Sequence, residues 1–291
     1  MFAVVSYTAS RSQSRLCAEK QLNVMSLRST ALLLIKMKFN AIAVLAAISG
    51  VSAAELAERA TTNTALQTSL PKSSGTSALS AAKTIAAGVS FDCGMKKFDR
   101  SPSTCEDQSE GGDADAVFIL KAGATLSNCI IGPNNGEGVH CKGTCTLNNV
   151  WWSNVCEDAL TLKQTSGTSY VNGGGAFSAD DKVLQHNGGG TLAVKNFYAE
   201  DVGKVYRSCG NCDTQYKRKS TFTNIRVNGA SVVAGINENY GDTTVIKNSC
   251  ILDSSICWLY DGNDDGDEPT KVASKPDGTY CVTSSVSTKS C

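Results

Sequence analysis

The sequence has little proline, no apolar run long enough to span a membrane, and no excess of charge of either sign. It holds five prolines in 291 residues, and its 27 basic and 27 acidic side chains cancel to a formal net charge of zero. A balanced charge predicts that neither nucleic acid nor an anionic membrane surface is a partner. The main apolar segment, residues 39–51, is shorter than the ~20 residues that cross a bilayer. We therefore expect no membrane insertion.

Sustained helical periodicity is also missing from the chain that follows residue 55. No stretch there keeps apolar residues at the 3.6-residue spacing of an amphipathic helix for long. The chain is instead rich in Ser, Thr, Asn and Val, with 26 glycines, a composition that favours strands and turns. A hydrophobic content of 41% is enough to form a core. These features predict an all-β protein.

Residues 37–54 have the features of a secretory signal peptide. Lys38 supplies the positive start, residues 39–51 the apolar core, and residues 51–53 the small side chains that suit cleavage. A membrane anchor over residues 31–48 is the alternative, but two lysines interrupt it. We therefore expect a secreted, extracellular protein.

This signal divides the chain into four parts. They are an upstream extension at 1–36, the signal peptide at 37–54, a Ser/Thr-rich leader at 55–84 and one folded domain at 85–291.

The cysteine count supports export independently. There are thirteen cysteines, and Cys17 lies upstream of the signal, which leaves twelve in the mature chain. An even number in an exported protein is typical of a disulfide framework. The close pairs Cys141/Cys145 and Cys209/Cys212 could instead bind zinc, but export favours disulfides. The pairing itself does not follow from the sequence.

A short repeat runs through the middle of the chain. A few Thr, Leu or Val residues are followed by Asn and then by an apolar or small residue, with the asparagines at 128, 149, 196, 224 and 248. Their spacings are 21, 47, 28 and 24 residues, so that one turn without its Asn is expected within 165–190. Short strands repeating at this period are typical of a solenoid, whereas a β-sandwich would place turns every 8–12 residues or so. We predict a right-handed parallel β-helix, a single-domain solenoid stapled by disulfides.

Charged residues recur eight to eleven positions after the asparagines. Taken in order they are Glu137, Glu157, Asp158, Lys204 and Arg207. Equal register in a solenoid means the same face, with successive turns ~4.8 Å apart. The three acids should therefore cluster, with the basic residues further along one groove. An all-oxygen cluster suits Ca²⁺, although a solvated acidic patch is the simpler alternative.

The row of cations beside the acids predicts an anionic ligand held between them. For an exported protein with an elongated groove, a polymer fits better than a metabolite. An acidic polysaccharide such as polygalacturonate would satisfy these requirements.

Three motifs resemble polysaccharide lyase family 3, the pectate lyases. They are Glu157-Asp158-Ala159, Asp180-Asp181-Lys182 with the following Gln185-x-Asn187-Gly188, and Asp201-Val-Gly-Lys204-Val-Tyr-Arg207. The resemblance covers roughly residues 85–285, and Cys209-Gly-Asn-Cys212 is similar to the fungal branch. It implies a secreted, Ca²⁺-dependent parallel β-helix that cleaves de-esterified pectin.

The resemblance also assigns roles to residues. It implies that Glu137, Glu157 and Asp158 bind the metal, with Glu137 in a place where the family often has Asp, and that Lys182, Lys204 and Arg207 are the catalytic basic residues.

The implied chemistry is β-elimination on polygalacturonate, which gives unsaturated oligogalacturonates. We expect Lys182 to be the base, provided that its surroundings lower its pKa, with Arg207 the second candidate and Lys204 the residue that binds the substrate carboxylate. The alternatives are a pectin-binding or cell-wall β-helix protein without turnover, and a hydrolase of the polygalacturonase type. We expect a monomer.

Overall fold

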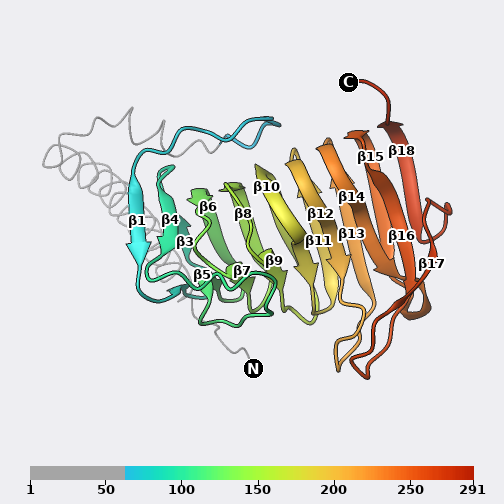
Figure 1. Cartoon of the computed structure of the whole chain (residues 1–291), viewed down its shortest axis with the longest axis horizontal. Helices are drawn as coiled ribbons and strands as arrows, with labels where there is room; N and C mark the ends of the chain where they lie inside the picture. Colours follow the sequence, from blue (N-terminus) through green and yellow to red (C-terminus); the bar gives the residue numbers. More distant parts are fainter. Residues whose placement is uncertain (1–62) are drawn as a thin grey trace, which may run out of the picture. The chain divides into compact units, whose positions relative to one another are not determined.

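The computed structural model describes residues 63–291, and they form a parallel β-helix with its strands stacked in chain order (Figure 1). The all-β solenoid expected from the repeat is confirmed. The expected extension and signal peptide, with the first part of the leader, lie outside the described residues. Within residues 63–291, no helix has the length and apolar character needed to cross a membrane.

Eighteen strands and one 3₁₀ helix (η1) make up the solenoid. In chain order they are β1 (Thr76–Leu79), β2 (Lys83–Ile85), β3 (Ser90–Asp92), β4 (Lys97–Arg100), β5 (Ala116–Leu120), β6 (Ala124–Ile131), β7 (Glu137–Cys141), β8 (Cys145–Trp152), β9 (Asp158–Leu162), β10 (Thr168–His186), β11 (Gly190–Lys195), β12 (Tyr198–Ser208), β13 (Arg218–Thr223), β14 (Arg226–Asn237), η1 (Glu238–Tyr240), β15 (Thr243–Leu252), β16 (Ser255–Asp261), β17 (Thr270–Ala273) and β18 (Cys281–Ser287).

The strands are arranged in three parallel ladders. The ladder that concerns the site runs β2, β5, β7, β9, then the second halves of β10, β12 and β14, and finally β16. A second ladder runs from β3 through β6, β8, β10, β11, β13 and β15 to β18. The third starts with β1 and β4 and continues through the ends of β6 and β8, the middle of β10, the first residues of β12 and β14, and the end of β15. Only β17 pairs antiparallel within this part of the chain, against β16.

The core consists of apolar side chains stacked in register from turn to turn. In the second ladder the aligned and buried residues are Leu126, Leu147, Val171, Val194, Phe222 and Ile246. Burying each such side chain contributes roughly 1.5–3 kcal/mol. Because every turn adds a member to the stack, a one-residue slip would move polar residues into the core, and the register is strongly specified.

The repeated asparagines occupy one corner of the solenoid in a left-handed backbone conformation. Asn128, Asn149, Asn196, Asn224 and Asn248 all have φ between 52° and 58°. Asn tolerates this conformation better than most residues because its short polar side chain bonds locally. Two rungs bond directly, since Asn149 Nδ2 donates to Asn128 Oδ1 (2.9 Å) and Asn224 Nδ2 to Asn196 Oδ1 (2.7 Å).

The turn expected to lack its Asn is confirmed, and Gly173 (φ 70°) stands in that place. A side chain there would overlap the backbone of Thr64, which crosses the ladder at this point. The Thr64 carbonyl accepts a hydrogen bond from Asn196 Nδ2 (2.7 Å), as the missing asparagine would have done. The leader therefore completes the ladder.

The solenoid begins before residue 85, where the sequence placed the start of the domain. β1 pairs in parallel with β4, and β2 with β5, so that residues 76–85 belong to the ladders. Their Ser/Thr-rich composition hides these strands, because Thr is itself a good strand former and the apolar positions are few.

All twelve cysteines of the expected framework are paired. The six disulfides are Cys93–Cys129, Cys105–Cys156, Cys141–Cys145, Cys209–Cys212, Cys250–Cys291 and Cys257–Cys281. The two close pairs that could have bound zinc are disulfides, as export predicted.

Replacing Asn224 separates the effect of its side chain from that of its backbone. Asn224→Ala and Asn224→Gly both lose the bond to Asn196, but only alanine is strained at a φ of 53°. We expect the alanine variant to be less stable than the glycine variant by about 1 kcal/mol in urea denaturation. At Thr221, which lies within β13, the order should reverse, with glycine the less stable. The same order at both positions would contradict this explanation.

Candidate functional site

Register in the site ladder brings the predicted residues side by side. Glu137 pairs with Asp158, Asp158 with Lys182, and Lys182 with Lys204 on successive strands. Arg207 lies three residues further along β12, opposite Gln185 of β10. The expected cluster of acids followed by cations on one face is therefore present.

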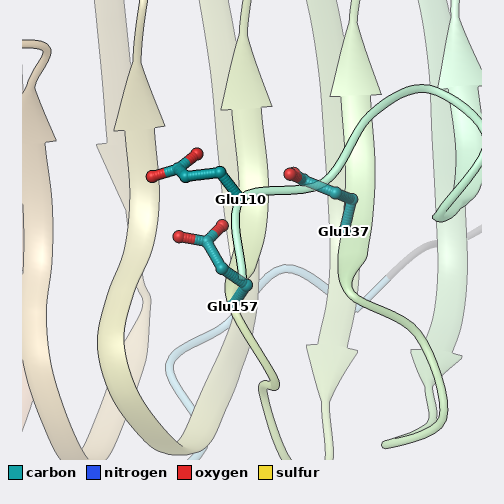
Figure 2. A group of neighbouring side chains, drawn as sticks. All are labelled: Glu110, Glu137 and Glu157. Atoms are coloured by element: carbon teal, nitrogen blue, oxygen red, sulfur yellow. The ribbon is translucent and has the colours of Figure 1, made fainter. Parts of the chain in front are cut away.

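The acids converge from two parts of the chain. Figure 2 shows the carboxyl groups of Glu110, Glu137 and Glu157 near one another, and one oxygen of each lies within 4.8 Å of the others. Glu137 begins β7 and Glu157 immediately precedes β9, whereas Glu110 belongs to the segment between β4 and β5. Glu110 was missed from the sequence because that segment lies outside the repeat and carries no register mark.

Glu137 is held by hydrogen bonds. Its Oε2 accepts from His140 Nε2 (2.7 Å) and Thr161 Oγ1 (3.2 Å), and its Oε1 accepts from the Gly111 amide (3.2 Å). Burial would raise the pKa of Glu137, but the contact with His140, the charge of Lys163 and the Thr161 bond outweigh it and lower the pKa. The fold therefore favours a charged Glu137.

Glu157 and Asp158 are also buried, but each has a carboxylate oxygen without a hydrogen bond among the described residues. Glu157 Oε2 and Asp158 Oδ1 accept no hydrogen bond from any of the described residues. Burial raises the pKa of Glu157 to about 7 despite its contact with Lys182, and raises the pKa of Asp158 well above its usual value. Two unsatisfied buried carboxylate oxygens beside Glu137 and Glu110 match the ligands that Ca²⁺ prefers. The donor set fits a hard cation.

Lys182 lies in the middle of the acids. Its Nζ is 2.7 Å from Glu157 Oε1, 2.6 Å from Asp181 Oδ2 and 3.7 Å from Asp158 Oδ1. Burial would lower the pKa of Lys182, but the charge of Asp158 and the contacts with Asp181 and Glu157 outweigh it and raise the pKa. The lowered pKa on which the choice of Lys182 as base depended is not found. The reason is that carboxylates rather than cations surround it.

Asp181 joins the two lysines. One of its oxygens accepts from Lys182 and the other from Lys204. Burial would raise the pKa of Asp181, but these two contacts outweigh it and lower the pKa. Asp181 therefore sets the spacing of the two ammonium groups along the site ladder.

Arg207 has surroundings of a different kind. Its Nη1 donates to Asn237 Oδ1 (3.0 Å), and its guanidinium lies 3.9 Å from the centre of the Tyr260 ring. No ion pair of Arg207 is found among residues 63–291. Burial lowers the pKa of this guanidinium, although Tyr260 and Asp242 oppose the shift. A side chain in place of Gly210 would overlap the guanidinium, so the glycine makes room for it.

Comparisons with known proteins agree with this geometry. The family model described as pectate lyase matches residues 67–267. Probable pectate lyase D of Emericella nidulans is 50% identical over 211 residues, which are 71% of this chain and 80% of that protein. Pectate lyase E of the same organism is 49% identical over 214 residues, 73% of this chain and 83% of that protein.

Two solved structures from Erwinia chrysanthemi are also similar. The catalytic domain of pectate lyase PelI has a TM-score of 0.60 at 32% identity, covering 74% of this chain and 98% of that domain. Pectate lyase PelI in complex with tetragalacturonic acid has a TM-score of 0.59 at 33% identity, covering 74% of this chain and 70% of that protein.

Proposed function

This chain belongs to the pectate lyase family, polysaccharide lyase family 3, and we propose that it cleaves de-esterified pectin by calcium-dependent β-elimination to give unsaturated oligogalacturonates. The observation that carries the proposal is the pair of buried carboxylate oxygens, on Glu157 and Asp158, that no described residue satisfies. They lie at one end of a row of cations in register, as a site for a cation and a polyanion requires.

Four carboxylates would hold the calcium ion: Glu137, Glu157 and Asp158 from the solenoid, and Glu110 from the segment before β5. When bound, Ca²⁺ withdraws electron density from the substrate C6 carboxylate and makes the C5 proton more acidic. Lys182 pairs with Glu157 and Asp158 in this structure, and it would be free to bind substrate once these acids hold the calcium ion. We assign Lys182 and Lys204, spaced by Asp181, to the substrate carboxylates, where their charge stabilises the carbanion-like transition state.

We assign the base to Arg207 in place of Lys182. Its guanidinium is buried and has no ion-pair partner in residues 63–291, and this burial lowers its pKa although the stacking on Tyr260 opposes the shift. Arg207 would accept the C5 proton in its neutral form, and the electron pair of the broken C5–H bond would form the C4–C5 double bond. The C4–O bond breaks, and the leaving oxygen takes a proton from solvent. No water is added across the bond, so that a hydrolase pair of carboxylates is not needed.

The substrate we propose is polygalacturonate, bound by an extracellular monomer. Support comes from the tetragalacturonic acid complex of the similar PelI and from the acids followed by cations along the site ladder.

Calcium dependence follows from the donor set. With polygalacturonate and Ca²⁺ we expect an increase in the ultraviolet absorbance of unsaturated products, which EDTA abolishes. Glu157→Gln and Asp158→Asn should each reduce the rate by about 100-fold or more, because each removes a charged ligand from the cluster. Glu238→Gln, in η1, removes the same charge and should leave the rate unchanged. Reducing ends without the absorbance would indicate hydrolysis, and EDTA-insensitive elimination would exclude the metal.

The same site makes calcium affinity depend on pH. A cation binds the deprotonated carboxylates, and burial places the pKa of Glu157 at about 7. Affinity should therefore rise between pH 6 and pH 8, as binding displaces fewer protons.

The base assignment predicts which variant moves the pH–rate profile. Arg207→Ala should lower kcat by about 10²–10⁴, the usual contribution of a general base. Arg207→Lys should retain some activity and shift the rising limb of the pH–rate profile to lower pH, because a lysine loses its proton more easily than an arginine. Lys182→Arg is the matched control and should leave that limb in place. If the limb instead moves in Lys182→Arg, the base is Lys182.

Export predicts the N-terminus of the mature protein. We propose that residues 37–54 are removed during secretion. Expression of the full chain in a fungal host should release into the medium a protein that starts close to residue 54, as read by N-terminal sequencing. Retention inside the cell, or an N-terminus before residue 37, would contradict the proposal.

A further inference from the structure

His140 lies between two carboxylates, one in the acidic cluster and one outside it. Its Nε2 is 2.7 Å from Glu137 Oε2, and its Nδ1 is 2.8 Å from Asp113 Oδ1. The His140 side chain is 1% exposed, and its bond to Glu137 is shielded from water. Both ring nitrogens are engaged, and neither is available to a ligand.

Asp113 is itself held in place by the segment between β4 and β5. The Cys105–Cys156 disulfide ties this segment to the solenoid just before Glu157, and Gln108 Nε2 donates to the Cys156 carbonyl (2.6 Å). Asp113 also forms ion pairs with Lys142 (2.9 Å) and Lys163 (3.5 Å). The far end of the His140 hydrogen-bond chain is therefore fixed.

The hydrogen bonds that start at Asp113 and pass through His140 end at Glu137, and both carboxylate oxygens of Glu137 accept hydrogen bonds. Its Oε2 accepts from His140 and Thr161, and its Oε1 accepts from the Gly111 amide. Thr161 also lies 3.5 Å from Asp158 Oδ2, which connects Glu137 to the next acid in register. A shift of the imidazole would therefore change the direction in which Glu137 faces the cluster.

We propose that His140, oriented by Asp113, is a positioning residue that holds Glu137 in the geometry needed to bind the cation. This inference rests on the proposed calcium role of Glu137. At 1% exposure, the His140 side chain has almost no surface that a substrate could touch. It acts through Glu137, as groups hydrogen-bonded to metal ligands do elsewhere, where their removal costs 10–100-fold in metal affinity or activity.

Calcium titration of the metal-free protein by calorimetry tests the inference. His140→Ala should weaken calcium binding by roughly 10–100-fold. Asp113→Asn should weaken it in the same direction by a smaller factor, since it leaves the imidazole present but less firmly oriented. The calcium concentration for half-maximal activity should rise in parallel, whereas kcat at saturating calcium should stay close to that of the wild type. Such rescue by calcium is not expected of a variant that merely unfolds.

Asp213→Asn, in an exposed loop, changes the same charge away from the cluster and should bind calcium as the wild type does. A calcium affinity of His140→Ala within twofold of the wild type would overturn the inference while leaving the proposed function intact. If His140→Ala does not fold, Asp113→Asn decides, because its side chain is 42% exposed and its replacement is tolerated more easily. A wild type that binds no calcium would instead contradict the proposed function, and this inference with it.

Discussion

Parallel register between successive turns is the constraint on which the site depends. Residues of equal register stand about 4.8 Å apart, so that an acid repeated on neighbouring turns is forced into contact with the next acid. The stacked apolar columns hold this register, since a slip of one residue would expose them. The same stacking that stabilises the core therefore compresses Glu137, Asp158 and Lys182 into one row. The free energy gained by burying the apolar core offsets the repulsion between the acids in this row.

Burying like charges in such a row is unfavourable unless something compensates them. Glu137 is compensated by hydrogen bonds, and Glu157 by its contact with Lys182. Asp158 keeps an oxygen that no described residue satisfies. A buried, unsatisfied carboxylate costs several kcal/mol in general, and a divalent cation is the partner that removes this cost for several acids at once. The free energy that these buried carboxylates cost the metal-free protein would then contribute to its affinity for the ion.

The cations differ through their neighbours rather than their residue type. Lys182 is surrounded by acids, Lys204 shares Asp181 with it, and Arg207 is stacked on Tyr260 away from any carboxylate contact that the structure shows in residues 63–291. An acid beside a base holds the proton on that base, whereas an aromatic ring and an amide hold it less. If the acids bind calcium as we propose, proximity to them and suitability as a base are opposed along the site ladder, and the two functions should fall on different residues.

The sequence by itself determined the solenoid, the asparagine corner and the row of charges, because all three are periodic and a period is visible in one dimension. It also predicted the disulfide framework, through the even count of the twelve cysteines that follow residue 54. The tertiary structure alone decided the partners of each cysteine, the stand-in role of Thr64 beside Gly173, and the approach of Glu110 to the acids. These contacts join segments that do not share the register of the repeat, so no periodic spacing in the sequence predicts them. The tertiary structure likewise decided how each cation is surrounded. Of the acids around Lys182, Asp181 is its neighbour in the chain, whereas packing across turns brings Glu157 and Asp158 to it.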